Sequence, residues 1–341
     1  HQYTSDGSTS IVNGGAVYVG GGTFKLSGGL IGKTTDSSTN NEIETAADAK
    51  NYSNKAVNGG GVYVDAGGEF TMQAASSIIS YNYAATTDDE HLGNGGGVYV
   101  NGGTFNLSGG NIQYNGASAG GGGLYVNGGT ANDNGTQNYS ILGNNADQGG
   151  GVYLNGSVTW NFSGNGENHA IMNNTATLNG GGMYIAEGTS RVTVNSYFTG
   201  NKATGNGGGI YASSKFTFTG VIKGDSTPAA QNGGGICLSS NAGGSTIGGT
   251  LSGLQASKGG AVYAAANITF SGTAHSNKAT VNGGGLYLAA GGAIGEKAYV
   301  GSEKKENGNT AQQGGGVYVA SYSLTVSGKI QNNVASGNGG G

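Results

Sequence analysis

The sequence predicts an all-β chain that folds as a right-handed, single-stranded parallel β-helix, a solenoid of about 11 coils with three short strands in each. A glycine pair or triplet, followed in all but one copy by aliphatic–tyrosine–aliphatic residues, opens at positions 14, 59, 95, 121, 149, 180, 207, 233, 259, 283 and 314. These starts lie 24 to 45 residues apart, a period typical of a solenoid whose units are stable only against their neighbours. Each unit also shows the two-residue alternation of strands and no helical stripe.

Each unit opens with a glycine corner and a first strand, as residues 95–120 illustrate. Val98 and Val100 face one side of this strand, and Tyr99 faces the other. The glycines at 95–97 stand where the chain must turn sharply between two faces, and glycine tolerates the positive φ of such a turn. We therefore expect the glycines to form the corners and the aliphatic residues to fill the interior.

The second and third strands follow within the same unit. Phe105 and Leu107 alternate with polar residues in the second strand, and the third carries Ile112 ahead of Asn115. An asparagine recurs at this corner, and stacked side-chain amides stabilise repeated β-structure by bonding from one rung to the next. The sequence therefore predicts a structural ladder of Asn54, Asn82, Asn115, Asn144, Asn174, Asn201, Asn277, Asn309 and Asn333.

We expect one β-helix domain over residues 1–341, as a segment of a longer array, because a further copy opens at Gly339 and is cut off. Its right hand is expected from the usual chirality of parallel crossovers. Two loop insertions, at 33–58 and 84–94, are expected to bulge from one corner. An open terminal rung would invite pairing with another chain, so that copies could stack end to end.

The amino-acid composition argues against some classes of function, nucleic-acid binding among them. Charged residues make up 9% of the chain, against roughly 25% in ordinary globular domains. The formal net charge is −4 and Arg191 is the single arginine, so we expect no nucleic-acid binding, which needs clustered basic residues. No apolar run is long enough for a membrane helix. A surface of Asn, Ser, Thr, Gly and Tyr suits an extracellular protein. The lone Cys237 occupies a tyrosine position, either as a tolerated substitution or for an intermolecular bridge.

Candidate catalytic groups are few. Glycoside hydrolysis needs two carboxylates that face each other across the sugar, but Asp65 and Glu187 follow first strands several coils apart. We therefore predict no catalytic residue, no cofactor and no metal site. The loop Asp88–His91 carries three acids and a histidine and could hold a hard cation, but it lacks the spacing of a calcium loop and is better interpreted as a solvated loop.

Tyrosine is the regularity that the fold leaves unexplained. Its neighbours in the first strand are aliphatic and claim the interior, so alternation predicts that the tyrosines lie on the outer surface. They would form either a ladder of stacked rings that covers the backbone or a contact surface, for sugars or for a second rod alongside. The candidate binding residues are Tyr18, Tyr63, Tyr99, Tyr125, Tyr153, Tyr184, Tyr211, Tyr263, Tyr287 and Tyr318.

The repeat also resembles a known family. A glycine string with aliphatic residues, paired with a later Ile/Phe-x-x-Asn, resembles the repeats of chlamydial polymorphic outer-membrane proteins and of large glycine-rich bacterial surface proteins. Residues 259–262 (GGAV) are similar to the first motif, and 198–201 (FTGN) and 162–165 (FSGN) to the second. The resemblance implies an autotransporter-like passenger, a secreted β-helix that is displayed on the cell surface and is often adhesive. The chain departs from it in its GGG strings and its fixed tyrosine.

We therefore expect a non-enzymatic, extracellular rod at the cell surface, either an adhesin passenger or stalk or a subunit of a filament built by end-to-end stacking. The first alternative is a glycan-binding module that uses the exposed tyrosine ladder. The second and less favoured alternative is a pectate-lyase-like enzyme that cleaves polysaccharides. The expected partners are copies of the chain itself, end to end or side by side, and glycans or proteins of a host or surface.

Overall fold

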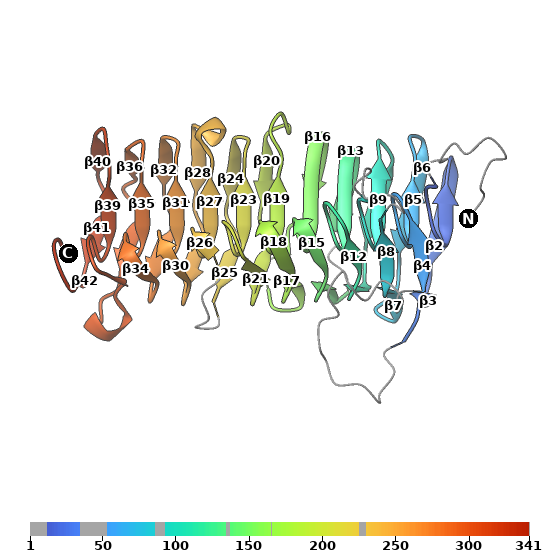
Figure 1. Cartoon of the computed structure of the whole chain (residues 1–341), viewed down its shortest axis with the longest axis horizontal. Helices are drawn as coiled ribbons and strands as arrows, with labels where there is room; N and C mark the ends of the chain where they lie inside the picture. The colour runs from blue at the N-terminus through green and yellow to red at the C-terminus, as the bar shows by residue number, and fades with distance from the viewer. Residues whose placement is uncertain are drawn as a thin grey trace.

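The computed structural model describes residues 12–34, 53–85, 93–133, 137–164, 166–224 and 230–340. Over these residues the chain winds into coils that lie side by side along one long axis, from the N-terminal coil at one end to the C-terminal coil at the other (Figure 1). Every strand pair in the described residues is parallel, and each strand pairs with its counterpart one coil away. The predicted parallel β-helix is thereby confirmed.

The first face of the solenoid holds the strands that follow the glycine corners. Its eleven strands are β1 (Val17–Val19), β5 (Val62–Val64), β9 (Val98–Asn101), β13 (Leu124–Asp133), β16 (Val152–Asn161), β19 (Met183–Ile185), β23 (Ile210–Ala212), β27 (Ile236–Leu238), β31 (Val262–Ala264), β35 (Leu286–Leu288) and β39 (Val317–Val319). The tyrosine positions of adjacent strands are in register, for example Tyr99 beside Tyr125.

The second face is built from the aromatic-rich strands. It begins with β2 (Gly22–Leu26), β6 (Gly68–Met72), β10 (Thr104–Leu107) and the later halves of β13 and β16. It continues with β20 (Val192–Val194), β24 (Phe216–Phe218), β28 (Ser245–Ile247), β32 (Ile268–Phe270), β36 (Gly292–Ile294) and β40 (Leu324–Val326).

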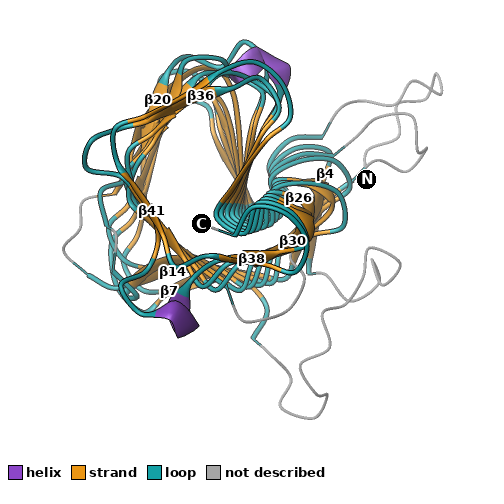
Figure 2. Ribbon diagram, turned by 90° about the vertical axis from the view of Figure 1, so that its left-hand side faces the viewer, coloured by secondary structure: helices purple, strands orange, loops and turns teal. Residues whose placement is uncertain are grey.

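The third face holds one strand from each coil. Its eleven strands are β3 (Gly29–Gly32), β7 (Ser77–Ser80), β11 (Gly110–Gln113), β14 (Tyr139–Leu142), β17 (His169–Met172), β21 (Tyr197–Thr199), β25 (Val221–Lys223), β29 (Thr250–Ser252), β33 (Thr273–His275), β37 (Tyr299–Gly301) and β41 (Lys329–Gln331). In Figure 2 the faces surround the axis of the solenoid, and strands of successive coils overlie one another.

A fourth short strand in each coil adds to the three that the sequence predicted. It begins at or just after the corner position and contributes a small buried residue, as Ala84, Ala117 and Ala146 show. These strands are β4 (Asn54–Ala56), β8 (Asn82–Ala84), β12 (Gly116–Ala117), β15 (Asn145–Gln148), β18 (Thr175–Asn179), β22 (Lys202–Ala203), β26 (Ala230–Asn232), β30 (Gln255–Lys258), β34 (Lys278–Asn282), β38 (Thr310–Ala311) and β42 (Val334–Ala335).

Inward side chains form one continuous core along the axis, as predicted for the aliphatic and aromatic positions. Val98, Phe105 and Ile112, from three faces of one coil, are all fully buried. Burying each such side chain contributes about 1.5–3 kcal/mol. A large inward side chain can lie beside a small one of the neighbouring coil: Trp160 is in register with Ala131 of the preceding coil.

Two kinds of corner use left-handed backbone. Gly95 opens a glycine triplet with a φ of +66°, and a Cβ there would lie 2.6 Å from the carbonyl oxygen of Val98. The residue before the corner asparagine is also left-handed in several coils, as at Tyr114 (φ 54°) and Ser276 (φ 56°). The non-glycine residues are strained at these corners, and the stacked coils hold them there.

Helical structure is minor in the described part of the chain, where two short 3₁₀ helices interrupt the strands. They are η2 (Ser240–Ala242) and η3 (Lys305–Asn307). Within the same described ranges, no helix has the length and apolar character needed to cross a membrane.

Candidate functional site: the tyrosine stack and its amides

The ten tyrosines of the first face form a stack along the axis. The rings from Tyr18 to Tyr211 make seven consecutive members, with centroids 4.6 to 5.3 Å apart and planes within 16° of parallel. Cys237 then takes the position between Tyr211 and Tyr263. Beyond it the stack resumes with Tyr263, Tyr287 and Tyr318, at 4.9 and 5.1 Å.

The prediction that these tyrosines form an exposed ladder is wrong for the second to fourth members of the stack, and the later members are partly buried. Tyr63, Tyr99 and Tyr125 are only 6 to 9% exposed, whereas Tyr18 at the N-terminal end is 53% exposed. Strand alternation does place the rings outside the core, but residues just before the glycine corners pack beside them. A Cβ at Gly120, for example, would lie 3.1 Å from the Tyr125 ring.

Stacking also closes the faces of the rings to other partners. Each internal ring lies between two others at about van der Waals separation, so only ring edges and hydroxyl groups face outward. Burial raises the pKa of Tyr63 to about 12 and of Tyr153 to about 12, with smaller contributions from neighbouring acidic or phenolic groups. The pKa of Tyr125 is raised further, again mainly by burial. These phenols are therefore neutral at physiological pH.

A chain of amides runs beside the stack, and we call it the outer amide chain. Asn155 Nδ2 donates to Asn127 Oδ1 (2.8 Å), and Asn127 donates in the same way to Asn101 (3.0 Å). Asn101 donates to Asp65 Oδ1 (3.1 Å), and the other carboxylate oxygen accepts the Tyr18 hydroxyl (2.7 Å). All three amide donors point toward the N-terminal coils, and the Tyr18 hydroxyl meets the carboxylate from the opposite side. The Tyr18 hydrogen bond, then those from the Ala66 amide and Asn101, lower the pKa of Asp65.

A parallel chain on the second face has the same polarity. Asn161 donates to Asn132 (2.8 Å), and Asn132 donates to Asn106 (2.8 Å). Asn106 then donates to Glu69 Oε1 (2.8 Å), so this chain also ends on a carboxylate in the second coil. The sequence analysis did not find either chain. The signal was available, because three successive repeats carry asparagine at each of these two positions.

The predicted corner ladder is confirmed for all nine of its asparagines. Asn144 is representative: its Nδ2 donates to Asn174 Oδ1 (3.0 Å) and to the Ile112 carbonyl (3.0 Å). Leu254 occupies the ladder position of the eighth coil, and residue 225, the position of the seventh, lies outside the described residues. The ladder therefore has two segments, with pairs that run from Asn54 to Asn201 and from Asn277 to Asn333.

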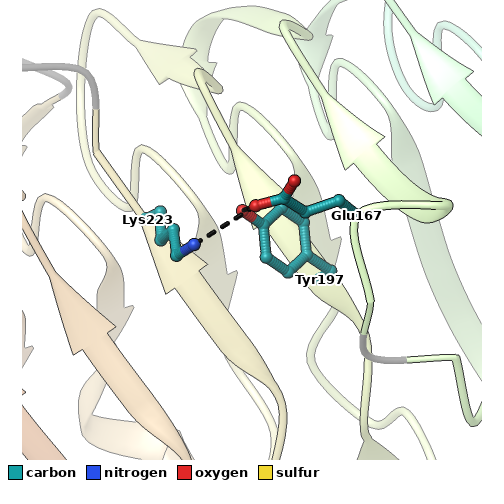
Figure 3. A network of polar contacts seen from close by, with 3 residues as sticks. All are labelled: Glu167, Tyr197 and Lys223. Atoms are coloured by element: carbon teal, nitrogen blue, oxygen red, sulfur yellow. Dashed lines mark hydrogen bonds and ion pairs between the residues drawn. The ribbon is translucent and has the colours of Figure 1, made fainter.

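Other polar side chains also link successive coils. Glu167 Oε1 accepts hydrogen bonds from the Tyr197 hydroxyl (3.0 Å) and from Lys223 Nζ (3.3 Å), as Figure 3 shows. The Lys223 ammonium also lies 5.4 Å from the centroid of the Tyr197 ring. The Tyr197 hydrogen bond and then the lysine lower the pKa of Glu167. The three residues come from three neighbouring coils and form a clamp across them, in which Glu167 and Lys223 are exposed and Tyr197 is buried.

A buried carboxylate, not predicted from the sequence, lies between the second and third faces. Asp133 Oδ2 accepts from the Tyr139 hydroxyl (2.9 Å) and from the Gly164 amide (3.0 Å). The Tyr139 ring packs 4.8 Å from His169, and burial, with the adjacent carboxylate, raises the pKa of its hydroxyl. Trp160 lies four residues before Gly164, and its Nε1 is buried without a hydrogen-bond partner.

The remaining predicted positions do not converge. Asp65 and Glu187 follow β5 and β19, which are four coils apart in the sheet of the first face. Cys237 is 4% exposed and burial raises its pKa to about 12, which disfavours an intermolecular bridge. The acidic loop Asp88–His91 and most of the insertions at 33–58 and 84–94 lie outside the described residues. In the ranges that the structure describes, no three His, Cys, Asp or Glu side chains gather as metal ligands.

Comparison with known proteins adds no relative: no family model, no curated protein and no solved structure matches the chain.

Proposed function

We propose that this chain is a structural or adhesive rod that works outside the cell without catalysing a reaction, as an adhesin passenger or stalk does. The observation that carries the proposal is the direction of its polar contacts. Hydrogen bonds run from coil to coil along the axis in the two amide chains and in the corner ladder. The tyrosine rings stack in the same direction. Such contacts strengthen a rod along its length.

The carboxylates of the first coils support the same interpretation. Asp65 and Glu69 each end an amide chain and accept hydrogen bonds from two or more side chains. An acid that is held in this way stabilises the end of its amide chain. We propose that these acids have a structural role in the stack of coils. The proposed partners along the rod are glycans or proteins of another surface.

The glycan-binding alternative loses its main argument. An aromatic platform for sugars needs an open ring face, and in this stack the internal rings cover one another. Lateral association of two rods through the first face is weakened in the N-terminal coils, since Tyr63, Tyr99 and Tyr125 are already buried within one chain. End-to-end stacking of copies stays part of the proposal.

Labelling of intact producing cells with an antibody, together with a turnover assay on a panel of polysaccharides, tests the proposal. We expect the chain to be accessible on the cell exterior and to leave every polysaccharide intact. Turnover that a single substitution, such as Asp65→Asn or Asp133→Asn, abolishes would refute the non-enzymatic rod. Sedimentation at increasing protein concentration tests the filament form, which a strictly monomeric species would contradict.

A further inference from the structure

Threonines form a straight row on the outer side of the second face. In the N-terminal coils Thr104 lies in register with Thr130, and Thr130 with Thr159. Thr23 and Glu69 extend this run toward the N-terminus. A second run continues on the strands from β20 to β40. We call both runs together the threonine lane, and the second contains Thr193, Thr217, Thr246, Thr269, Ala293 and Thr325.

A second polar lane lies two residues further along the same strands. It begins with Lys25 and Thr71 and continues with the amides of Asn106 and Asn132. Because alternate residues of a strand face the same side, both lanes point outward while the residues between them fill the core. In the C-terminal coils the corresponding positions lie just beyond the ends of the strands and hold small residues, among them Thr219, Gly248, Ser271, Gly295 and Ser327.

The threonine lane is open to solvent, whereas the second lane is only partly so, because Asn106 is 9% exposed and Gly248 is buried. One cation reaches the threonine lane from beside it: the Arg191 guanidinium donates to the Thr217 hydroxyl (3.2 Å). Thr159, Thr193 and Thr269 are exposed, and the other threonines of the lane are at least partly exposed. Glu69 and Lys25, in the first two coils, are the charged members of the two lanes among the described residues. Viewed down the axis, the strands from β20 to β36 lie over one another, so the face is flat rather than strongly twisted (Figure 2).

This arrangement sets two regular spacings. Adjacent strands place like side chains about 4.8 Å apart, and in the N-terminal coils, where one strand carries both lanes, its alternate residues lie about 6.7 Å apart. The ring spacings of the tyrosine stack, 4.6 to 5.3 Å, agree with the first value. Threonine is stiff at χ1, so each methyl and hydroxyl group is held in place before any ligand arrives.

The two spacings lie close to the repeats of oxygen atoms along the a and c axes of hexagonal ice. We propose that the second face is an ice-binding surface, on which the threonine lane orders water into the lattice of the crystal. The lane's hydroxyl groups would take lattice positions, and its methyl groups would sit in the spaces between water molecules. A rigid, prearranged face loses little conformational entropy when it binds. This activity does not depend on the rod's proposed role as a stalk or adhesin.

A crystalline polysaccharide is the other periodic surface to consider, and the face suits it less well. Recognition of sugars commonly uses an exposed aromatic ring, whereas the aromatic residues of these strands point inward. Phe105, Phe218 and Phe270 are at most 1% exposed, and Trp160 is 6% exposed. The face therefore offers small polar and methyl groups without a ring to stack on a sugar.

Ice-affinity partitioning and inhibition of ice recrystallisation by the full chain test the proposal. We expect the chain to enter growing ice and to keep crystals small. Thr269→Tyr should abolish both effects, because the ring lifts the face off the crystal, and Thr159→Tyr should do the same in the N-terminal run. Thr280→Tyr is the matched control, since Thr280 is an exposed strand residue of β34 on the fourth face. It should keep both activities.

Far-UV circular dichroism and thermal melting check that each variant is folded. Exclusion of the parent chain from growing ice, in the manner of an ordinary protein, would overturn the proposal. So would equal loss in folded Thr269→Tyr and Thr280→Tyr, or binding to crystalline cellulose or chitin without any partition into ice.

Discussion

Asn115 donates from Nδ2 to Oδ1 of Asn144 in the next coil, over 3.1 Å, and its backbone N–H reaches the same oxygen over 2.9 Å. The two residues are fully buried. Each corner amide thus fixes the spacing of two coils, and loss of one amide leaves several buried groups without partners.

Replacement of Asn144 with leucine tests this link. The variant removes the acceptor of Asn115 and the donor to Ile112 and Asn174, and each buried group left unsatisfied costs about 1–3 kcal/mol. We expect the free energy of unfolding to fall by about 3 kcal/mol or more, measured by urea unfolding. Asn127→Leu is the control, because Asn127 belongs to the half-exposed outer amide chain. We expect this substitution to lower the free energy of unfolding by about 1 kcal/mol. Equal losses would contradict the special role of the corner.

The carboxylate of Asp65 predicts a dependence of stability on acid pH. Its pKa is lowered in the folded protein, chiefly by the Tyr18 hydroxyl. Its contribution to stability is therefore complete above the unfolded pKa of about 3.9 and is lost as pH falls through the folded value. We expect the melting temperature of Asp65→Asn to depend less on pH in this acid range than the melting temperature of the parent chain does.

Tyr18→Phe gives the matched measurement for Asp65. Removal of the largest cause of the shift should move the carboxyl pKa up toward its ordinary value, as NMR titration of the side-chain carbonyl would detect. A pKa that does not change in Tyr18→Phe would show that the hydroxyl does not hold the carboxylate.

The gap at Cys237 predicts that tyrosine would complete the stack. Its neighbours in register, Tyr211 and Tyr263, each lack one ring partner, and an aromatic pair contributes about 0.5–1.5 kcal/mol beyond its buried area. We expect Cys237→Tyr to raise the free energy of unfolding by about 1 kcal/mol, and Cys237→Ser to lower it. Greater destabilisation by tyrosine than by serine would show that the stack cannot accept a ring there.

The left-handed corner at Ser276 predicts a stabilising glycine. Ser276 has a φ of 56°, a conformation that costs a non-glycine residue about 1–2 kcal/mol. Ser276→Gly should therefore raise the midpoint of unfolding. In contrast, Ser252→Gly in strand β29 should lower it, because glycine weakens a strand by about 0.5–1 kcal/mol relative to alanine. A drop of similar size in both variants would rule out strain at the corner.

Local patterns in the sequence were enough to predict the solenoid and its corner ladder. The alternation around Phe105 and the recurrence of asparagine at positions such as Asn115 depend only on neighbours in the chain and on the repeat. The fourth strand was not predicted, because its inward residue is a small alanine, as at Ala84, and the strand is only two to five residues long.

The burial of the tyrosines could not be predicted in the same way. Alternation assigns Tyr125 to the outer side of its strand, but the cover comes from residues such as Gly120 at the end of the preceding segment. That contact depends on how the fourth strand returns to the first face. The outer amide chain gives a weaker signal for a different reason: asparagine recurs at its position in only three successive repeats, at Asn101, Asn127 and Asn155.

The central claim is that function is spread along a uniform rod, and deletion of whole coils tests it most directly. Removal of residues 95–120, or of 259–282, joins one glycine corner to the next and keeps every face in register. We predict that both deletions fold, reach the cell surface and lower adhesion or assembly by similar small amounts, whereas the half-coil deletion 259–270 does not fold. Loss of all activity in one whole-coil deletion, with the other unaffected, would place the function in a single local site and contradict the account.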